Sequence, residues 1–178
     1  MNGASEEAVE QLRAIYNCVT QCEQSEDEEA CSEQYCVEPV ILCLGGRDTQ
    51  SPAVTELRNA LGGRTLTYVR RWSDVGEGFS ISGEERRILT LCATGQFAYQ
   101  EESKTFASGD IGDTNHSGMI GDGDVIQGQW QVYMLGAAYV LELARTDGRT
   151  KLVSMAVQDN DLYLDGDIFE VSNASECP

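Results

Sequence analysis

Seven cysteines are the residues of this sequence whose type and spacing most clearly indicate chemistry. Five of them lie in the first quarter of the chain, and the complete set is Cys18, Cys22, Cys31, Cys36, Cys43, Cys92 and Cys177. A structural zinc site would favour C-x-x-C pairs or nearby histidines, because zinc takes its ligands in a tight tetrahedron. The clustered spacings here are C-x3-C and C-x4-C, and no C-x-x-C redox motif is present. The cysteines therefore favour disulfide bonds over metal binding.

Two predicted helices determine how four of these cysteines can pair. Residues 5–24 have the apolar spacing of an amphipathic helix, which places Cys18 and Cys22 on one face. A capping-box pattern at residues 25–28 opens a second helix that Pro39 is expected to end. If the two helices are antiparallel, they give a nested pair of bridges, Cys22–Cys31 and Cys18–Cys36. Such bridges would stabilise a hairpin too short to bury much apolar area.

The remaining cysteines predict a third bridge and a leftover thiol. We expect Cys43 to pair with Cys177, which would tie the N-terminal segment to the chain end, and Cys92 to stay reduced inside a strand. Disulfides require an oxidising compartment, so we expect an extracytoplasmic protein, secreted or periplasmic. Residues 1–5 lack the basic and apolar stretches of a leader, and we interpret the sequence as one whose leader has been removed. The alternative is a cytosolic protein with reduced cysteines.

Aspartates and glycines gather in two segments and raise the question of calcium binding. The first group is Asp110, Asp113, Asp122 and Asp124, and the second is Asp159, Asp161, Asp165 and Asp167. Calcium takes about six to eight oxygen ligands, but neither segment has the glycine and the closing glutamate of an EF-hand loop in register. Tight turns need the same residue types. We therefore expect no cofactor and keep calcium as an alternative.

No catalytic motif can be assembled from the sequence. The one histidine, His116, lies in a polar segment and leaves no Ser-His-Asp or Cys-His arrangement to test. The segment Gly45-Gly46-Arg47 lacks the Lys-Ser/Thr of a phosphate-binding loop. With 30 acidic residues in the chain, no carboxylate pair can be singled out for acid/base chemistry. We expect a binding or interaction protein rather than an enzyme.

The charge balance excludes several classes of partner. The 178 residues include 30 acidic and 12 basic side chains, for a formal charge of -18. A surface this negative repels phosphate backbones and anionic lipid headgroups, so nucleic-acid and membrane-surface partners are not expected. No apolar run approaches the roughly 20 residues that a membrane-spanning helix needs. The length suits one full domain with a small appendage.

The elements that must position these residues change type near residue 63. Before it, a short helix is predicted over 51–61, with Pro52 at its first position and Gly62-Gly63 after its end. After it, alternating apolar and polar residues indicate strands, and residues 103–127, rich in Gly, Asp and Ser, indicate a loop with one or two short strands. The predicted strands are 65–71, 87–92, 96–99, 129–134, 139–145, 150–157 and 162–171. Turn signals about every ten residues favour an antiparallel barrel or sandwich over a parallel α/β sheet.

Short motifs in the strand-rich part resemble those of a known family. The run 91–99 has the pattern L-x-x-x-G-x-F-x-Y, Gly128-Gln129-Trp130 has the pattern G-x-W, and strand–turn–strand segments follow at 140–148 and 162–166. Their order and spacing resemble bacterial lipocalin-like, calycin-type domains over residues 62–172. The resemblance does not include the cysteine-rich N-terminal part. It implies an up-and-down β-barrel whose interior holds a hydrophobic ligand, and it carries fold better than function.

We therefore predict a mainly β protein in three parts. Residues 1–44 form a cysteine-rich helical hairpin, residues 45–63 form a linker with a short helix, and residues 64–178 form a lipocalin-like, antiparallel up-and-down barrel. Strand alternation places one set of aromatic and apolar side chains on the same face of the sheet. These candidate pocket residues are Tyr68, Phe97, Tyr99, Trp130, Tyr139, Leu141 and Met155. The alternative is that they only fill the core of a solid barrel.

Three functional hypotheses follow from this organisation. The leading one is a secreted or periplasmic module that binds a small apolar ligand in the barrel. The second is a protein-interaction module, such as a protease inhibitor or an adaptor, in which the acidic run 23–33 of the N-terminal hairpin contacts a basic protein partner. The third is an enzyme that folds its substrate in the barrel cavity, such as a cyclase.

Overall fold

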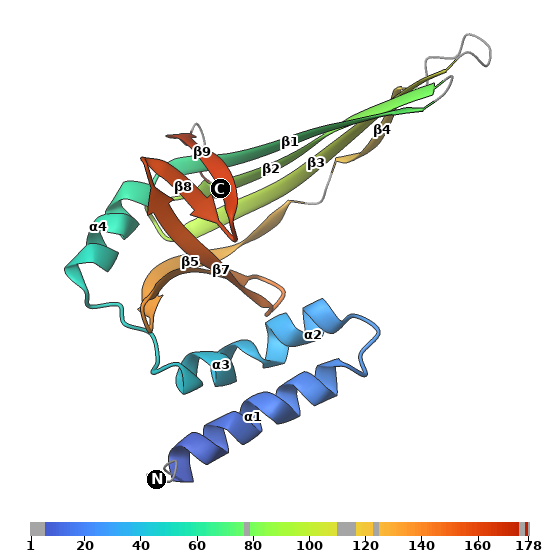
Figure 1. The fold of residues 1–178 in the computed structure, drawn as a ribbon. Coiled ribbons are helices and arrows are strands. Elements are labelled where there is room, and N and C mark those ends of the chain that lie inside the picture. The colour runs from blue at the N-terminus through green and yellow to red at the C-terminus, as the bar shows by residue number, and fades with distance from the viewer. Residues whose placement is uncertain (1–5, 77–78, 110–116, 123–124, 175–176, 178) are drawn as a thin grey trace.

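The computed structural model describes residues 6–76, 79–109, 117–122, 125–174 and 177. Four helices precede nine strands along the chain (Figure 1). The helices are α1 (Glu6–Cys22), α2 (Glu28–Tyr35), α3 (Val37–Cys43) and α4 (Pro52–Leu61). The strands are β1 (Arg64–Gly76), β2 (Phe79–Leu91), β3 (Gln96–Gly109), β4 (Ser117–Asp122), β5 (Ile126–Leu135), β6 (Ala138–Arg145), β7 (Thr150–Gln158), β8 (Asp161–Leu164) and β9 (Asp167–Asn173).

Eight of the strands close into an antiparallel up-and-down barrel. The hydrogen-bonded order runs from β2 through β1, β9, β8, β7, β6 and β5 to β3, and β3 pairs with β2 to complete the circle. Each pairing is antiparallel, and β4 pairs with β3 outside this circle. The mainly β, antiparallel barrel predicted from the sequence is therefore confirmed. Closure removes the free edges of the eight strands along the barrel wall.

The N-terminal helices confirm one prediction and correct another. The helix expected over residues 5–24 is α1, but the helix expected to end at Pro39 is two helices, α2 and α3. The helical segment is interrupted at Cys36, which is the C-cap of α2 and the N-cap of α3. Pro39 lies in the first turn of α3, where a missing N–H costs no intrahelical hydrogen bond. The cap of α2 is Asp27, whose side chain accepts from the backbone N of Ala30 at 2.9 Å.

The three disulfides of the described residues correct part of the predicted connectivity. Cys18–Cys36 and Cys22–Cys31 cross-link α1 to the α2–α3 segment as predicted, with Cα–Cα distances of 5.5 and 5.4 Å. The predicted pair Cys43–Cys177 is wrong, because Cys177 is bonded to Cys92 and Cys43 is a free thiol. The three bridges are compatible with an oxidising compartment.

Barrel closure explains why Cys92 and Cys177 meet. Arg64 pairs with Leu91 on one side of β1 and with Asn173 on the other. The residue after β2 and the segment after β9 therefore arrive at the same end of the barrel, where the Cα atoms of the two cysteines are 5.7 Å apart. This proximity depends on strands that are distant in sequence.

Three strands are longer than the sequence predicted. β1, β2 and β3 continue beyond the barrel as a twisted extension that carries β4 at its edge (Figure 1). The predicted strand 65–71 extends to Gly76, and part of the predicted loop 103–127 belongs to β3 and β4. Cross-strand pairs stabilise this extension. One is the ion pair between Arg71 Nε and Glu84 Oε2, at 2.8 Å.

Turn chemistry fixes the register of the strands as expected. Gly95 has a φ of +90° in the turn between β2 and β3, a value that favours glycine. The predicted strand 162–171 is the hairpin of β8 and β9, joined by Asp165 and Gly166 with φ values of +51° and +88°. Positive φ at both positions is what a two-residue hairpin turn requires.

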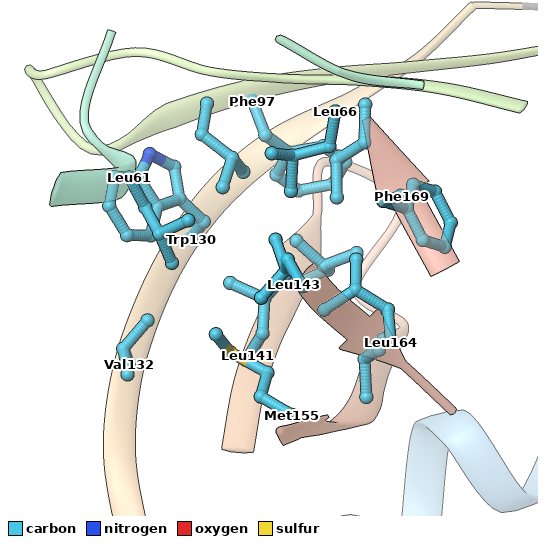
Figure 2. Close-up of a cluster of buried hydrophobic side chains, with 14 of the residues drawn as sticks. Leu61, Leu66, Phe97, Trp130, Val132, Leu141, Leu143, Met155, Leu164 and Phe169 are labelled. Carbon is cyan, nitrogen blue, oxygen red and sulfur yellow. The ribbon is translucent and has the colours of Figure 1, made fainter. Parts of the chain in front are cut away.

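Inward-facing side chains form one apolar core inside the barrel. Leu66, Leu91 and Leu141 are fully buried, and Phe97 is 1% exposed. Figure 2 shows Leu66 and Phe97 on one side and Leu141 on the other, pointing toward a common interior. The predicted helix at 51–61 is α4, and its Val54 and Leu61 join this core at one end of the barrel. The inner row of β7 ends at Met155, because Val157, two positions further along the strand, is 65% exposed.

The helix α3 covers part of the outer face of the barrel. Ile41 packs with Tyr133 and Val140, which point outward from β5 and β6. Beneath this contact Glu142 is buried and accepts hydrogen bonds from Arg47 Nε at 2.9 Å and from Tyr133 OH at 2.8 Å. Arg47 also binds Glu38 of α3. This network fixes the N-terminal helices to the wall of the barrel.

Candidate ligand-binding site

The two ends of the barrel are closed differently by helices. Along β6, Tyr139 lies in a shallow groove beside α4, whereas Arg145 lies in a cavity beside α2. At the α4 end, apolar side chains of the helix and the strands pack together, and the groove beside them has a volume of about 370 Å³ and is more open to solvent. The α2 end keeps a cavity of about 300 Å³ between the interior of the barrel and the helix. This cavity is the candidate ligand-binding site.

The walls of the cavity are the inward-facing side chains at one end of the strands. Because side chains alternate along a strand, Leu143 and Arg145 share the inner face of β6, and Lys151 and Val153 share the inner face of β7. The apolar wall consists of Leu89, Phe97, Leu143, Val153, Leu164 and Phe169. Figure 2 shows four of them, Phe97, Leu143, Leu164 and Phe169, within the core cluster. The deep part of the cavity is therefore apolar.

The mouth of the cavity is ringed by charged side chains. Four of the 12 basic residues of the chain line it, namely Arg87, Arg145, Arg149 and Lys151. Opposite them, α2 and its cap contribute Asp27, Glu29 and Glu33. This concentration of basic residues is unusual in a chain with a formal charge of -18. The site thus combines an apolar interior with a cationic barrel rim and an acidic helix.

Ion pairs join the helix to the rim. Lys151 Nζ lies 3.3 Å from Glu29 Oε1, and Arg145 NH1 lies 3.7 Å from Glu33 Oε2. Arg145 and Glu33 are mostly buried, with side-chain exposures of 17% and 13%. Arg145 NH2 also contacts Asp147, at 2.8 Å. The carboxylates of α2 therefore act as counter-ions for cations that the barrel presents.

One donor of Arg145 is left without an acceptor. Its Nε is buried and has no hydrogen-bond partner within the part of the chain that the structure describes. A buried guanidinium donor without a partner is costly, so it points to an acceptor that completes the site.

Two aromatic residues at the rim connect the cavity to neighbouring charges. Tyr99 lines the cavity and donates its hydroxyl to Glu101 at 3.0 Å. Burial, together with Glu101, raises the pKa of Tyr99 to about 12, so the phenol is neutral and a donor near neutral pH. The guanidinium of Arg87 lies 5.1 Å from the ring centre of Tyr68, and Tyr68 in turn packs against Phe169.

The residues predicted from sequence for the pocket fall into three groups. Phe97 and Tyr99 line the cavity, and Tyr139 and Met155 line the groove beside α4. The other three pack in or against the core: Tyr68, Trp130 and Leu141. Trp130 is held there by a hydrogen bond from its Nε1 to the carbonyl of Cys92, at 2.9 Å. The structure therefore brings only part of the predicted set to one cavity.

Sequence reasoning missed the basic rim. Arg145 follows Leu143, and Lys151 precedes Val153, each two positions away on the same strand. Two-residue spacing places such pairs on one face, so alternation already contained the signal. What it could not show is that α2 carries carboxylates to these cations.

The proposed calcium ligands are only partly described. The described residues do not include Asp110, Asp113, His116 or Asp124, nor the side chain of Asp122. In the second aspartate group, Asp165 accepts hydrogen bonds from Ser154, and Asp167 pairs with Arg87. Among the described residues, the one close group of candidate metal ligands is Cys18, Cys22 and Cys36. Their sulfurs are in disulfides and so are not thiolate ligands.

Comparison of the chain with family models, with curated proteins and with solved structures finds no match. Within the described residues, no helix is long and apolar enough to cross a membrane.

Proposed function

We propose that this protein is a lipocalin-like binding module that takes a small molecule with an apolar body into the cavity beneath α2. The observation that carries the proposal is a cavity of about 300 Å³ between α2 and the apolar interior of the barrel, which is more enclosed than the groove beside α4. Its volume lies at the lower end of the range of small-molecule sites, which are largely apolar with a few polar groups.

The arrangement of the helices supports entry from the α2 end. At the other end, Val54 and Leu61 of α4 are buried in the core, so this helix is part of the packed interior. α2 has no buried residue of its own and is attached to the rim by ion pairs. A helix with little apolar burial can move away at lower cost than one that is part of the core.

The disulfides support an extracytoplasmic location for this binding function. Two of them hold α2 and α3 to α1, and the third joins the turn after β2 to the segment after β9. Bridges of this kind persist in secreted or periplasmic proteins, where thiols are not kept reduced. A carrier of a poorly soluble ligand outside the cytoplasm is consistent with this location.

A neutral fluorescent probe, N-phenylnaphthylamine, tests the binding function. We expect its emission to rise on binding, and we expect Ala30→Trp to abolish the rise because the indole fills the cavity mouth from α2. Val153→Trp fills the cavity from the barrel wall and should have the same effect. The control is Val171→Trp, at a position 49% exposed on β9, which should bind the probe normally. Equal probe binding by all four proteins, or none by the unmodified chain, would overturn the proposal.

One observation favours a second candidate function, the recognition of a basic protein partner. The outer face of α1 exposes an apolar stripe at helical spacing, made of Val9, Leu12, Tyr16 and Val19, with exposures of 44–69%. Acidic residues surround it on α1 and in the run 23–33. We expect a synthetic amphipathic helix of leucine and lysine to bind this stripe, and Tyr16→Glu to weaken that binding. Unchanged binding by this variant would remove the second candidate.

A further inference from the structure

The charges at the cavity mouth divide unevenly between the barrel and α2. The barrel side contributes four cations and two carboxylates, whereas α2 and its cap contribute three carboxylates. Both barrel carboxylates are already engaged, Asp165 with Ser154 and Asp167 with Arg87. Asp147, outside the cavity lining, also pairs with Arg145 and Arg149, so Lys151 is the rim cation whose described ion pair comes from α2 alone.

The hydrogen-bonding groups show which sign of charge the site can still accept. Glu29 and Glu33 are each within an ion-pair distance of a rim cation. In contrast, Nε of Arg145 is a buried donor with no partner among the described residues. An unfilled donor calls for an acceptor, so the site is suited to an anion rather than to a cation.

We propose that the ligand is an amphipathic carboxylate, whose hydrocarbon body enters the apolar cavity and whose carboxylate is bound by Arg145, Arg149 and Lys151. This inference rests on the proposed binding function and specifies the chemistry of the ligand. In the structure Glu33 pairs with Arg145 and Glu29 pairs with Lys151, whereas Arg149 pairs with Asp147 of the turn between β6 and β7. The ligand and α2 therefore compete for Arg145 and Lys151.

Because of this competition, removing a negative charge from α2 should change the affinity for the carboxylate in the opposite direction to removing a positive charge from the rim. Neutralising a rim cation removes an attraction for the ligand and weakens carboxylate binding. Neutralising Glu33 removes both a competitor and a like charge near the carboxylate, so it strengthens carboxylate binding. If Glu33 only held the helix over the cavity, its removal would weaken the binding of every ligand to a similar degree.

Three ligands with the same alkyl chain test the proposal by calorimetry or by displacement of N-phenylnaphthylamine. They are decanoate, the neutral decanol and the cationic decyltrimethylammonium. We expect decanoate to bind at least about tenfold more tightly than decanol, because charge-assisted hydrogen bonds contribute that much when partly buried. The cation should bind more weakly than decanol. Added salt should weaken decanoate binding and leave decanol binding nearly unchanged.

Variants that each neutralise one charge test which residues cause the preference for decanoate over decanol. Arg145→Gln and, at a more exposed position, Lys151→Gln should each reduce the preference for decanoate over decanol by several-fold. The control Arg71→Gln removes a cation from the extension of β1, where the side chain is 78% exposed, and should leave the preference unchanged. Glu33→Gln should raise decanoate affinity, and its control is Glu10→Gln on α1, which is exposed.

The outcomes separate this inference from the proposed function. If none of the three ligands and no neutral probe binds, the binding function itself is wrong. If decanol and decanoate bind equally, or if Arg145→Gln and Lys151→Gln keep the full preference for decanoate, the ligand is not a carboxylate held by this rim. If Glu33→Gln weakens decanoate and decanol alike, competition with α2 is wrong.

Discussion

The guanidinium of Arg145 faces the carboxylate of Glu33 across the mouth of the barrel, with 3.7 Å between NH1 and Oε2. One residue ends β6, and the other lies in α2, so this pair connects the barrel interior to the helix that covers it. Because the helix buries no residue of its own, such ion pairs carry much of its attachment to the barrel, whereas a disulfide attaches it to α1. The position of α2 should therefore respond to charge.

Reversing one charge tests how α2 is held. Glu33→Arg places two guanidinium groups together and should release the helix from the rim, while the disulfides to α1 keep it tethered. We expect faster amide hydrogen exchange in α2 and unchanged exchange in the barrel strands. The control Glu10→Arg changes the charge by the same amount on an exposed turn of α1. If α2 exchanges equally slowly in both variants, the ion pairs do not hold it.

The buried network around Glu142 should be important for stability. This carboxylate accepts hydrogen bonds from Arg47, Gln131 and Tyr133 at 2.8–2.9 Å. Burial and the hydrogen bond to Glu142 raise the pKa of Tyr133, which keeps its phenol a donor at neutral pH. Glu142→Ala removes the acceptor of Gln131 and Tyr133, leaves Arg47 paired only with Glu38, and should lower the free energy of unfolding by about 3 kcal/mol.

An exposed ion pair provides the comparison for Glu142 in denaturant unfolding. Glu84→Ala removes a carboxylate that pairs with the exposed Arg71, and it should change the free energy of unfolding little, because solvent screens such a pair. A similar small loss for Glu142→Ala would contradict the view that this network anchors α3 to the barrel.

A glycine in the barrel wall and a glycine in the extension of β1 and β2 should respond differently to a methyl group. A Cβ on Gly128 would collide with the backbone carbonyl of Ala144 and approach Phe97 at 2.7 Å, so Gly128→Ala should destabilise the fold by about 3 kcal/mol or more. A Cβ on Gly83 would meet only the indole of Trp72 among the nearest atoms, and that side chain is 41% exposed and free to turn outward. Thermal unfolding should show Gly83→Ala as the milder change, and the reverse order would contradict the described packing.

The cysteine connectivity predicts how many thiols react. Alkylation in denaturant without reductant should label one cysteine, Cys43, and labelling after reduction should reach all seven. Peptide mapping should recover Cys92 linked to Cys177, a bridge that spans 85 residues and should contribute about 4 kcal/mol by restricting the unfolded chain. Recovery of a Cys43–Cys177 peptide would contradict this connectivity. The variant Cys43→Ser should leave all three bridges intact.

Local patterns were sufficient to predict most of the architecture. Alternation identified the strands from β5 to β9, and turn residues such as Gly95 and Gly166 placed the hairpins. Helical spacing placed Cys18 and Cys22 on one face, which led to the two bridges of the N-terminal hairpin. These features depend on residues close together in the sequence.

Features set by distant residues were not predictable in the same way. Cys92 meets Cys177 only because β1 pairs with both β2 and β9. The extension of β1 and β2 depends on cross-strand pairs such as Arg71 with Glu84, which no single segment reveals. The candidate site has the same character. Of its apolar wall, only Phe97 was among the predicted pocket residues, and the pairing of its rim with α2 depends on how the helices pack.

Methyl-selective NMR during a titration with decanol tests the central claim of a binding cavity beneath α2 most directly. Binding there should shift the methyl signals of Leu143, Val153 and Leu164, which line the cavity. The methyl signals of Val54, in α4 at the other end of the barrel, should stay in place. Shifts confined to Val54 and the groove beside α4, or to the exposed stripe on α1, would contradict the account.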